Sequence, residues 1–205
     1  MIFKFLESLV VGASIAAIPG PIFFELVRRT LTKGLRQGIW LVLGEFTGNF
    51  LLLLIIFFGA AQFLTDHTLK RLFYIIGGSI LLWVSVSAFR LKIDSVDASY
   101  KEKVTDKGRL AYLTGFSIAV TSPIVIALWV SLSGSYLNKL DSHILAFVNI
   151  LLIALGFMCF FIPMAYVIHK TRHKIPPSKV VILSRAFGVV LAVYGIALLR
   201  GALTK

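Results

Sequence analysis

Two groups of helix-breaking residues stand inside long apolar runs of this sequence. The first group is Pro19, Gly20 and Pro21, and the second is Thr121, Ser122 and Pro123. Proline removes a backbone donor and clashes with the carbonyl one turn earlier, so each group should interrupt a helix. Freed peptide groups cannot face lipid, but they can line a wet cavity. We therefore predict a site for a polar solute at these interruptions, where amides suit a carboxylate and carbonyls an ammonium. A simple kink in each helix is the alternative.

Polar side chains inside other apolar runs are further candidates. Glu45 and Asn49 are four residues apart and share one helix face. A carboxyl inside a membrane segment is costly unless it is protonated, paired or hydrated. Glu45 is therefore a candidate for proton coupling or ammonium recognition, with an interfacial ion pair as the alternative. Asn149 is the other deep polar group, and it could face Asn49 or form a packing hydrogen bond between helices.

Glu25 follows the first interruption by one turn and is the second candidate for proton coupling. Arg28 and Arg29 stand three and four residues later, which is good spacing for a structural ion pair, and we favour that pairing. The sequence has no H-E-x-x-H, no phosphate-binding glycine loop and no deep histidine to act as a base. We expect no catalytic residues, no metal site and no cofactor.

The composition indicates which elements must hold these residues. Of the 205 residues, 58% are hydrophobic and 15% are charged, and the mean hydropathy is +0.92. Soluble domains are about half apolar and a quarter charged. The net charge of +12 lies in short loops beside apolar segments and forms no basic face, so we expect no nucleic-acid partner. The chain is predicted to be one polytopic membrane domain.

Six apolar segments are long enough to cross roughly 30 Å of hydrocarbon as helices. Their approximate cores are residues 5–27, 39–63, 72–89, 110–132, 144–168 and 180–199. A cleavable signal peptide is the alternative for the first. Most Lys and Arg residues fall on one side of this arrangement, and positive loops face the cytoplasm. We therefore expect a multi-pass protein of the cell membrane with both termini outside the cytoplasm.

The two halves of the chain echo one another. The segment that starts at Gly12 recurs from Gly115 at an offset of 103, and Gly78 and Leu81 recur as Gly188 and Leu191 at an offset of 110. With three helices each, the halves would enter the membrane from opposite faces, as in many secondary transporters. We predict an all-α fold of two inverted three-helix repeats, about 1–92 and 110–205, joined by a cytoplasmic connector at about 93–109. Chance similarity between apolar helices is the alternative.

On these residues the sequence resembles the LysE/RhtB family of amino acid exporters over nearly the whole chain. The likeness rests on the six segments, on P-G-P in the first, on Pro123 in the fourth, and on glycines at Gly34, Gly38, Gly44 and Gly48. The resemblance implies efflux of amino acids driven by the proton gradient. Asn49 stands where the family has an acidic residue, and the family's N-P-K motif is here Ser122-Pro123-Ile124. That Glu45 takes over the acidic role is a hypothesis.

The expected function is secondary-active export of amino acids or related small metabolites by alternating access around the two broken helices. The expected partners are the lipid bilayer and the amino acid substrate, and a homodimer is compatible with so small a membrane domain. A metal-cation exporter is one alternative, since Glu25 and Glu45 could supply oxygen ligands. A membrane partner protein that transports nothing is the other.

Overall fold

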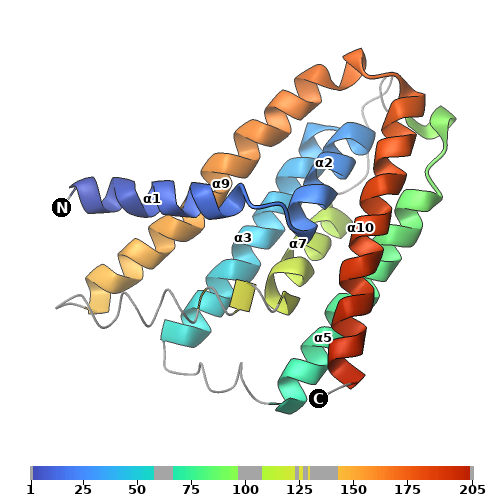
Figure 1. Ribbon diagram of the computed structural model, residues 1–205. Helices are drawn as coiled ribbons and strands as arrows, with labels where there is room; N and C mark the ends of the chain where they lie inside the picture. The colour runs from blue at the N-terminus through green and yellow to red at the C-terminus, as the bar shows by residue number, and fades with distance from the viewer. Residues whose placement is uncertain are drawn as a thin grey trace.

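The computed structural model describes residues 2–57, 67–96, 108–122, 125–126, 129 and 143–203. The described part is helical and contains no strand, which confirms the predicted all-α class. The long helices, drawn in Figure 1, are α1 (Ile2–Ala16), α2 (Pro21–Lys33), α3 (Leu35–Phe57), α5 (His67–Phe89), α7 (Arg109–Thr121), α9 (His143–Thr171) and α10 (Pro177–Leu203).

The first apolar segment is broken where the sequence predicts an interruption. α1 ends at Ala16, α2 begins at Pro21, and the two helices are bent by 77°. Gly20 has extended backbone angles, and Pro21 occupies the first turn of α2, where its missing N–H costs no hydrogen bond. The bend sends α1 across α9 and away from α5 and α10 (Figure 1).

The fourth apolar segment is also interrupted. α7 ends at Thr121, and Ser122 has extended backbone angles with ψ of 114°. Residues 125 and 126 are helical again. Pro123, the third residue of the predicted interruption, lies outside the described residues.

Glycines let three pairs of helices pack with their backbones in close approach. In each pair, higher residue numbers on one helix meet lower numbers on the other, so the two helices are antiparallel. Between α1 and α9, a Cβ on Gly12 would collide with the carbonyl of Ile153, and one on Gly156 with the carbonyl of Leu9. Between α3 and α7, a Cβ on Gly44 would collide with the carbonyl of Tyr112, and one on Gly115 with the carbonyl of Leu41. Between α5 and α10, a Cβ on Gly78 would meet the carbonyl of Gly195.

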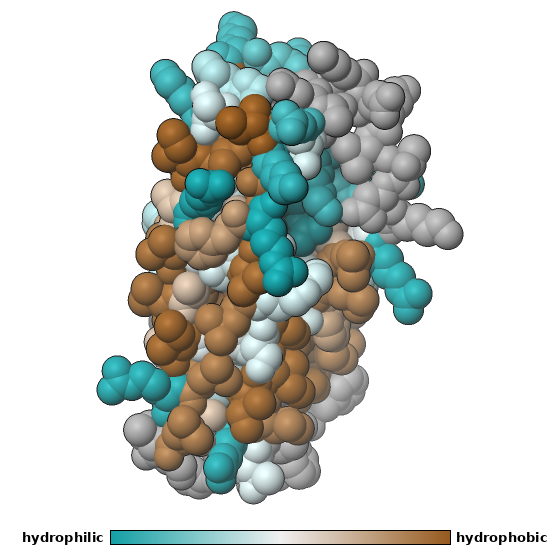
Figure 2. Space-filling model, turned by 90° about the vertical axis from the view of Figure 1, so that its right-hand side faces the viewer, coloured by the Kyte–Doolittle hydropathy of each residue, from teal (hydrophilic) through white to brown (hydrophobic). Residues whose placement is uncertain are grey.

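Several of the described helices are suited to a bilayer. Three are long and apolar enough to cross it, Leu35–Ile56, Phe147–Lys174 and Pro177–Leu203, and the bent pair Phe5–Ala16 and Pro21–Lys33 makes a fourth if it is one span. Tyr74–Phe89 is a shorter apolar helix. Figure 2 shows a broad apolar surface on the side of α5 and α10, with hydrophilic residues gathered toward its upper end. The fold is that of a multi-pass membrane protein, and the count of six spans stays a prediction.

The connections that carry the basic residues lie together at one end of the helices. Gly34, with φ of 89°, turns the chain between α2 and α3, and the amide of Leu35 donates to Nδ1 of His169 near the end of α9 (3.3 Å). Part of the predicted connector, residues 93–96, is helical, and its Val96 is fully buried. We call the apolar residues packed here the loop-end cluster: Leu31, Val96, Val180 and Val181.

We predict that the variant Gly44→Val will destabilise the fold by about 1–3 kcal/mol, since its side chain forces α3 and α7 apart. Purified protein in detergent should lose several degrees of apparent melting temperature. The matched control is Gly20→Ala, because a Cβ at position 20 meets no atom within 4 Å. A melting temperature of Gly44→Val equal to that of the control would contradict the close approach of the two helices.

Candidate functional site

A cavity of about 400 Å³ lies between the two helix interruptions. This volume falls within the roughly 300–1,000 Å³ that is typical of small-molecule sites. The start of α2 and the end of α7 reach its wall, and α5 and α10 supply the rest. The described residues that line it are Pro21, Tyr74, Leu81, Ile118, Thr121, Ser122, Tyr194, Ala197, Leu198 and Gly201.

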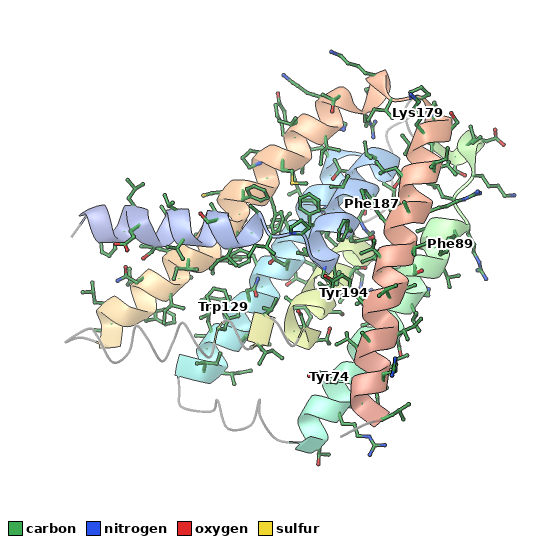
Figure 3. The ribbon with its side chains drawn as sticks, in the orientation of Figure 1. Tyr74, Phe89, Trp129, Lys179, Phe187 and Tyr194 are labelled. Carbon is green, nitrogen blue, oxygen red and sulfur yellow. The ribbon has the colours of Figure 1, made fainter. Side chains whose placement is uncertain are left out.

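Helix α10 presents one face to the cavity. Tyr194, Ala197, Leu198 and Gly201 follow the spacing i, i+3, i+4 and i+7, which places them on one stripe of a helix. Tyr74 lies on the facing helix α5, and its ring packs against the backbone of Gly201. Figure 3 shows Tyr74 and Tyr194 at different heights along this pair of helices. Two of the positions on the cavity face of α10, Ala197 and Gly201, carry small residues.

Three of the sequence-predicted site residues lie on the cavity wall: Pro21, Thr121 and Ser122. The hydroxyl of Thr121 donates to the carbonyl of Ser117, and the hydroxyl of Ser122 accepts from the amide of Val125 at 3.4 Å. Pro19 and Gly20 form the connection between α1 and α2, with Pro19 exposed. The amides in the first turn of a helix lack partners within it, and no side chain caps α2.

Glu45 and Asn49 belong to a separate, buried network on α3. The Asn49 side-chain amide donates to Oε1 of Glu45 at 2.7 Å, and Nε1 of Trp129 donates to Oδ1 of Asn49 at 2.9 Å. Glu45 is 3% exposed, and its Oε2 has no hydrogen-bond partner among the described residues. Trp129 lies beside α3 (Figure 3), in an apolar core that includes Phe157. Neither Glu45 nor Asn49 is among the described residues of the cavity wall.

Glu25 forms the structural ion pair that its spacing favours. Its carboxylate accepts from Nε of Arg28 at 2.7 Å and from the guanidinium of Arg29 at 2.8 Å. Arg29 also donates to the hydroxyl of Thr114 on α7 at 3.3 Å. Glu25 is 0% exposed, and both arginines are buried. These four residues, which we call the Glu25 cluster, tie α2 to α7.

Asn149 bonds to partners that the sequence does not indicate. Its Oδ1 accepts from the hydroxyl of Ser8 on α1 at 2.9 Å, and its Nδ2 donates to the carbonyl of Leu145 at 2.8 Å. The predicted alternative of a packing hydrogen bond between helices is the one observed, with Ser8 as the partner instead of Asn49. This hydrogen bond therefore joins α1 to α9 through two residues, Ser8 and Asn149, that are 141 positions apart in the sequence.

Several residues of the site carry no signal in the sequence. The tyrosines of the cavity and Trp129 stand in apolar runs without a motif, and Thr114 resembles any other helix threonine. The helical period groups Tyr194 with Gly201, but it cannot say which face of a membrane helix meets protein. Within the described residues, no three His, Cys, Asp or Glu side chains gather closely enough to hold a metal ion.

Two known bacterial proteins are similar to this chain in sequence. Over 139 residues, 66% of its length, the chain is 28% identical to the Bacillus subtilis protein named "Putative amino acid efflux protein YcgF", of which the match covers 64%, slightly less than two thirds. It is 26% identical over 141 residues to "Chemotactic transduction protein ChpE" of Pseudomonas aeruginosa, covering 69% of this chain and 68% of that protein. No solved structure matches the chain.

The family comparison covers almost the whole chain. Residues 13–202 match the family described as LysE type translocator, a range that includes both interruptions, the cavity wall and the two buried carboxyl groups. The chain belongs to the LysE type translocator family.

Proposed function

We propose that this protein exports amino acids or related small metabolites and binds them in the cavity between the two helix interruptions. The observation that carries the proposal is that the start of α2 and the end of α7 both reach the wall of one cavity. Helix interruptions that line a cavity are the usual substrate sites of secondary transporters. The name of the Bacillus subtilis relative adds support.

The two helix ends suit a zwitterion. A helix carries about half a positive charge at its amino end and about half a negative charge at its carboxyl end. The amino end of α2 therefore favours the substrate carboxylate, and the carboxyl end of α7 favours its ammonium group. Pro21 and Ser122 stand at these two ends on the same cavity wall.

An inverted repeat is supported by contacts that recur at constant offsets. Gly12 meets the carbonyl of Ile153, and Gly115 meets the carbonyl of Leu41. An offset of 103 relates Gly12 to Gly115, and an offset of 112 relates Leu41 to Ile153. The same offsets hold for a second pair of contacts. Adding 112 to Gly44 gives Gly156, subtracting 103 from Tyr112 gives Leu9, and Gly44 meets the carbonyl of Tyr112 as Gly156 meets that of Leu9. Two halves related by a pseudo-two-fold axis would produce this reciprocity.

The pair of α5 and α10 follows the same rule with an offset of 110. Gly78 meets the carbonyl of Gly195, and Gly188 meets the carbonyl of Ser85. Adding 110 to Gly78 gives Gly188, and adding 110 to Ser85 gives Gly195. Any regular antiparallel helix pair gives equal offsets of this kind, so the support here is that glycine stands at both ends of the offset, at Gly78 and Gly188 and in the contact of Gly195.

Alternating access then requires α2 and α7 to separate on one side of the cavity. The Glu25 cluster joins the two helices beyond the cavity, and the loop-end cluster packs over the same end. The nearby connections are rich in Lys and Arg, so we assign this end to the cytoplasm and both termini to the opposite side. In this arrangement the cytoplasmic side is closed, and breaking the contact of Arg29 with Thr114 opens it.

Glu45 is the group we propose for proton coupling. Its carboxyl is buried and its Oε2 has no hydrogen-bond partner among the described residues, so it can accept a proton without breaking a described contact. Glu25 is less suited, because both of its carboxylate oxygens already accept hydrogen bonds from arginines. The same pairing weakens the case for a metal-cation exporter.

The cavity can be tested by filling it. We expect Leu198→Trp to lower amino acid export in proteoliposomes to the level of protein-free vesicles, because the indole would occupy the cavity. Val193→Trp is the matched control, since Val193 lies on the same helix and is 61% exposed on the apolar surface. Equal export by folded samples of both variants would remove the cavity from the mechanism. If the unmodified protein carries cations but no amino acids, the metal-cation exporter is favoured. If it carries neither, a membrane partner protein that transports nothing is favoured.

Glu45 can be tested with a pH gradient across the vesicle membrane. Coupling energies between two bound ligands change affinity by about 5- to 150-fold. We expect the uncoupler-sensitive part of the export rate to fall by a factor in this range in Glu45→Gln. Glu45→Asp should retain some of that uncoupler-sensitive export. Glu7→Gln is the control, because Glu7 is exposed on α1. Undiminished, uncoupler-sensitive export by both Glu45 variants would rule out the role.

A further inference from the structure

The wall of the cavity also bears on which amino acids it accepts, an inference that rests on the proposed function. None of the ten described lining residues is charged. Its side walls are made by the rings of Tyr74 and Tyr194 and by aliphatic side chains at Leu81, Ile118 and Leu198. A surface of this kind gains free energy by covering apolar groups and offers no counter-ion to a charged one.

The acidic residues of the described chain are engaged elsewhere or lie away from the wall. Glu25 is held by two arginines, and Glu45 bonds to Asn49 in the core beside Trp129. Neither Glu7 nor Asp94 lines the cavity. A lysine or arginine substrate would place its side-chain cation against the apolar wall, where none of the described lining residues is a carboxylate. Burial of an unpaired charge is strongly unfavourable.

The size of the cavity is set by small residues on α10. Ala197 and Gly201 lie on the cavity face between larger neighbours, and the Tyr74 ring packs against the backbone of Gly201. A volume of about 400 Å³ leaves room for a large side chain beyond the two helix ends. Aromatic walls also favour aromatic guests through edge-to-face and offset stacking.

We propose that this exporter is selective for neutral amino acids with large apolar or aromatic side chains, and that Ala197 and the two tyrosines determine this selectivity. The helix ends bind the charged groups that all amino acids share, and the wall that includes Tyr74 and Tyr194 contacts the substrate side chain. Basic amino acids are rejected because the described wall holds no carboxylate.

The test measures export of L-phenylalanine, L-leucine, L-alanine and L-lysine by the purified protein in proteoliposomes. We expect the rates for phenylalanine and leucine to exceed that for lysine by roughly tenfold or more, the scale on which apolar pockets discriminate. Lysine exported as fast as phenylalanine would overturn the selectivity while leaving the exporter function standing. Folded protein that exports none of the four would overturn the exporter function itself.

Two variants separate the wall from general damage. Ala197→Phe narrows the cavity, so export of phenylalanine should fall by roughly tenfold while that of alanine changes much less. Leu198→Glu adds a carboxylate to the wall and should raise the ratio of lysine to phenylalanine export several-fold. Val193→Phe, on the apolar surface of the same helix, should leave all ratios unchanged. Equal losses for phenylalanine and alanine in Ala197→Phe, or an unchanged ratio in Leu198→Glu, would overturn the proposal.

Discussion

Peptide groups in a bilayer must find hydrogen-bond partners inside the protein, and the rest of this structure depends on that constraint. The prolines around Gly20 break the first apolar segment, and the helices on either side of the break are bent by 77°. The amides at the start of α2 then have to face protein or a wet space. Because α7 ends near the same place, both sets of exposed helix ends reach one cavity. A site with partial charges of both signs follows from backbone geometry, without a single charged side chain on the described wall.

Close packing by glycine is the second condition. A wall assembled from α2, α5, α7 and α10 holds its shape only if those helices approach closely, and lipid supplies no hydrophobic force to press them together. Van der Waals contact between backbones supplies that force instead, at Gly78 between the wall helices α5 and α10 and at Gly44 between α3 and the wall helix α7. Glycines also bring α1 and α9 into close approach, so the same kind of contact supports three pairs of helices.

The two buried carboxyl groups show how differently the same group can be accommodated. Glu25 sits between two guanidinium groups, and the cluster carries one more positive than negative charge while it bridges α2 and α7. Glu45 has a single amide donor and an unpartnered oxygen in the described structure. The first arrangement fixes two helices to each other. The second leaves an oxygen without a described partner, which is the reason we propose Glu45 and not Glu25 for proton coupling.

The sequence by itself determined the features that depend on nearby residues. Its hydropathy requires a membrane, its prolines break the first segment, and Glu25 pairs with arginines one turn away because a helix brings those positions together. It could not place Tyr74 beside Gly201, pair Asn149 with Ser8, or bring Trp129 to Asn49, because these contacts join helices far apart in the chain. In a membrane helix nearly every face is apolar, so the usual distinction between a buried and an exposed stripe is lost. Only the tertiary structure decided which faces meet, and therefore that the cavity lies against α5 and α10, away from Glu45.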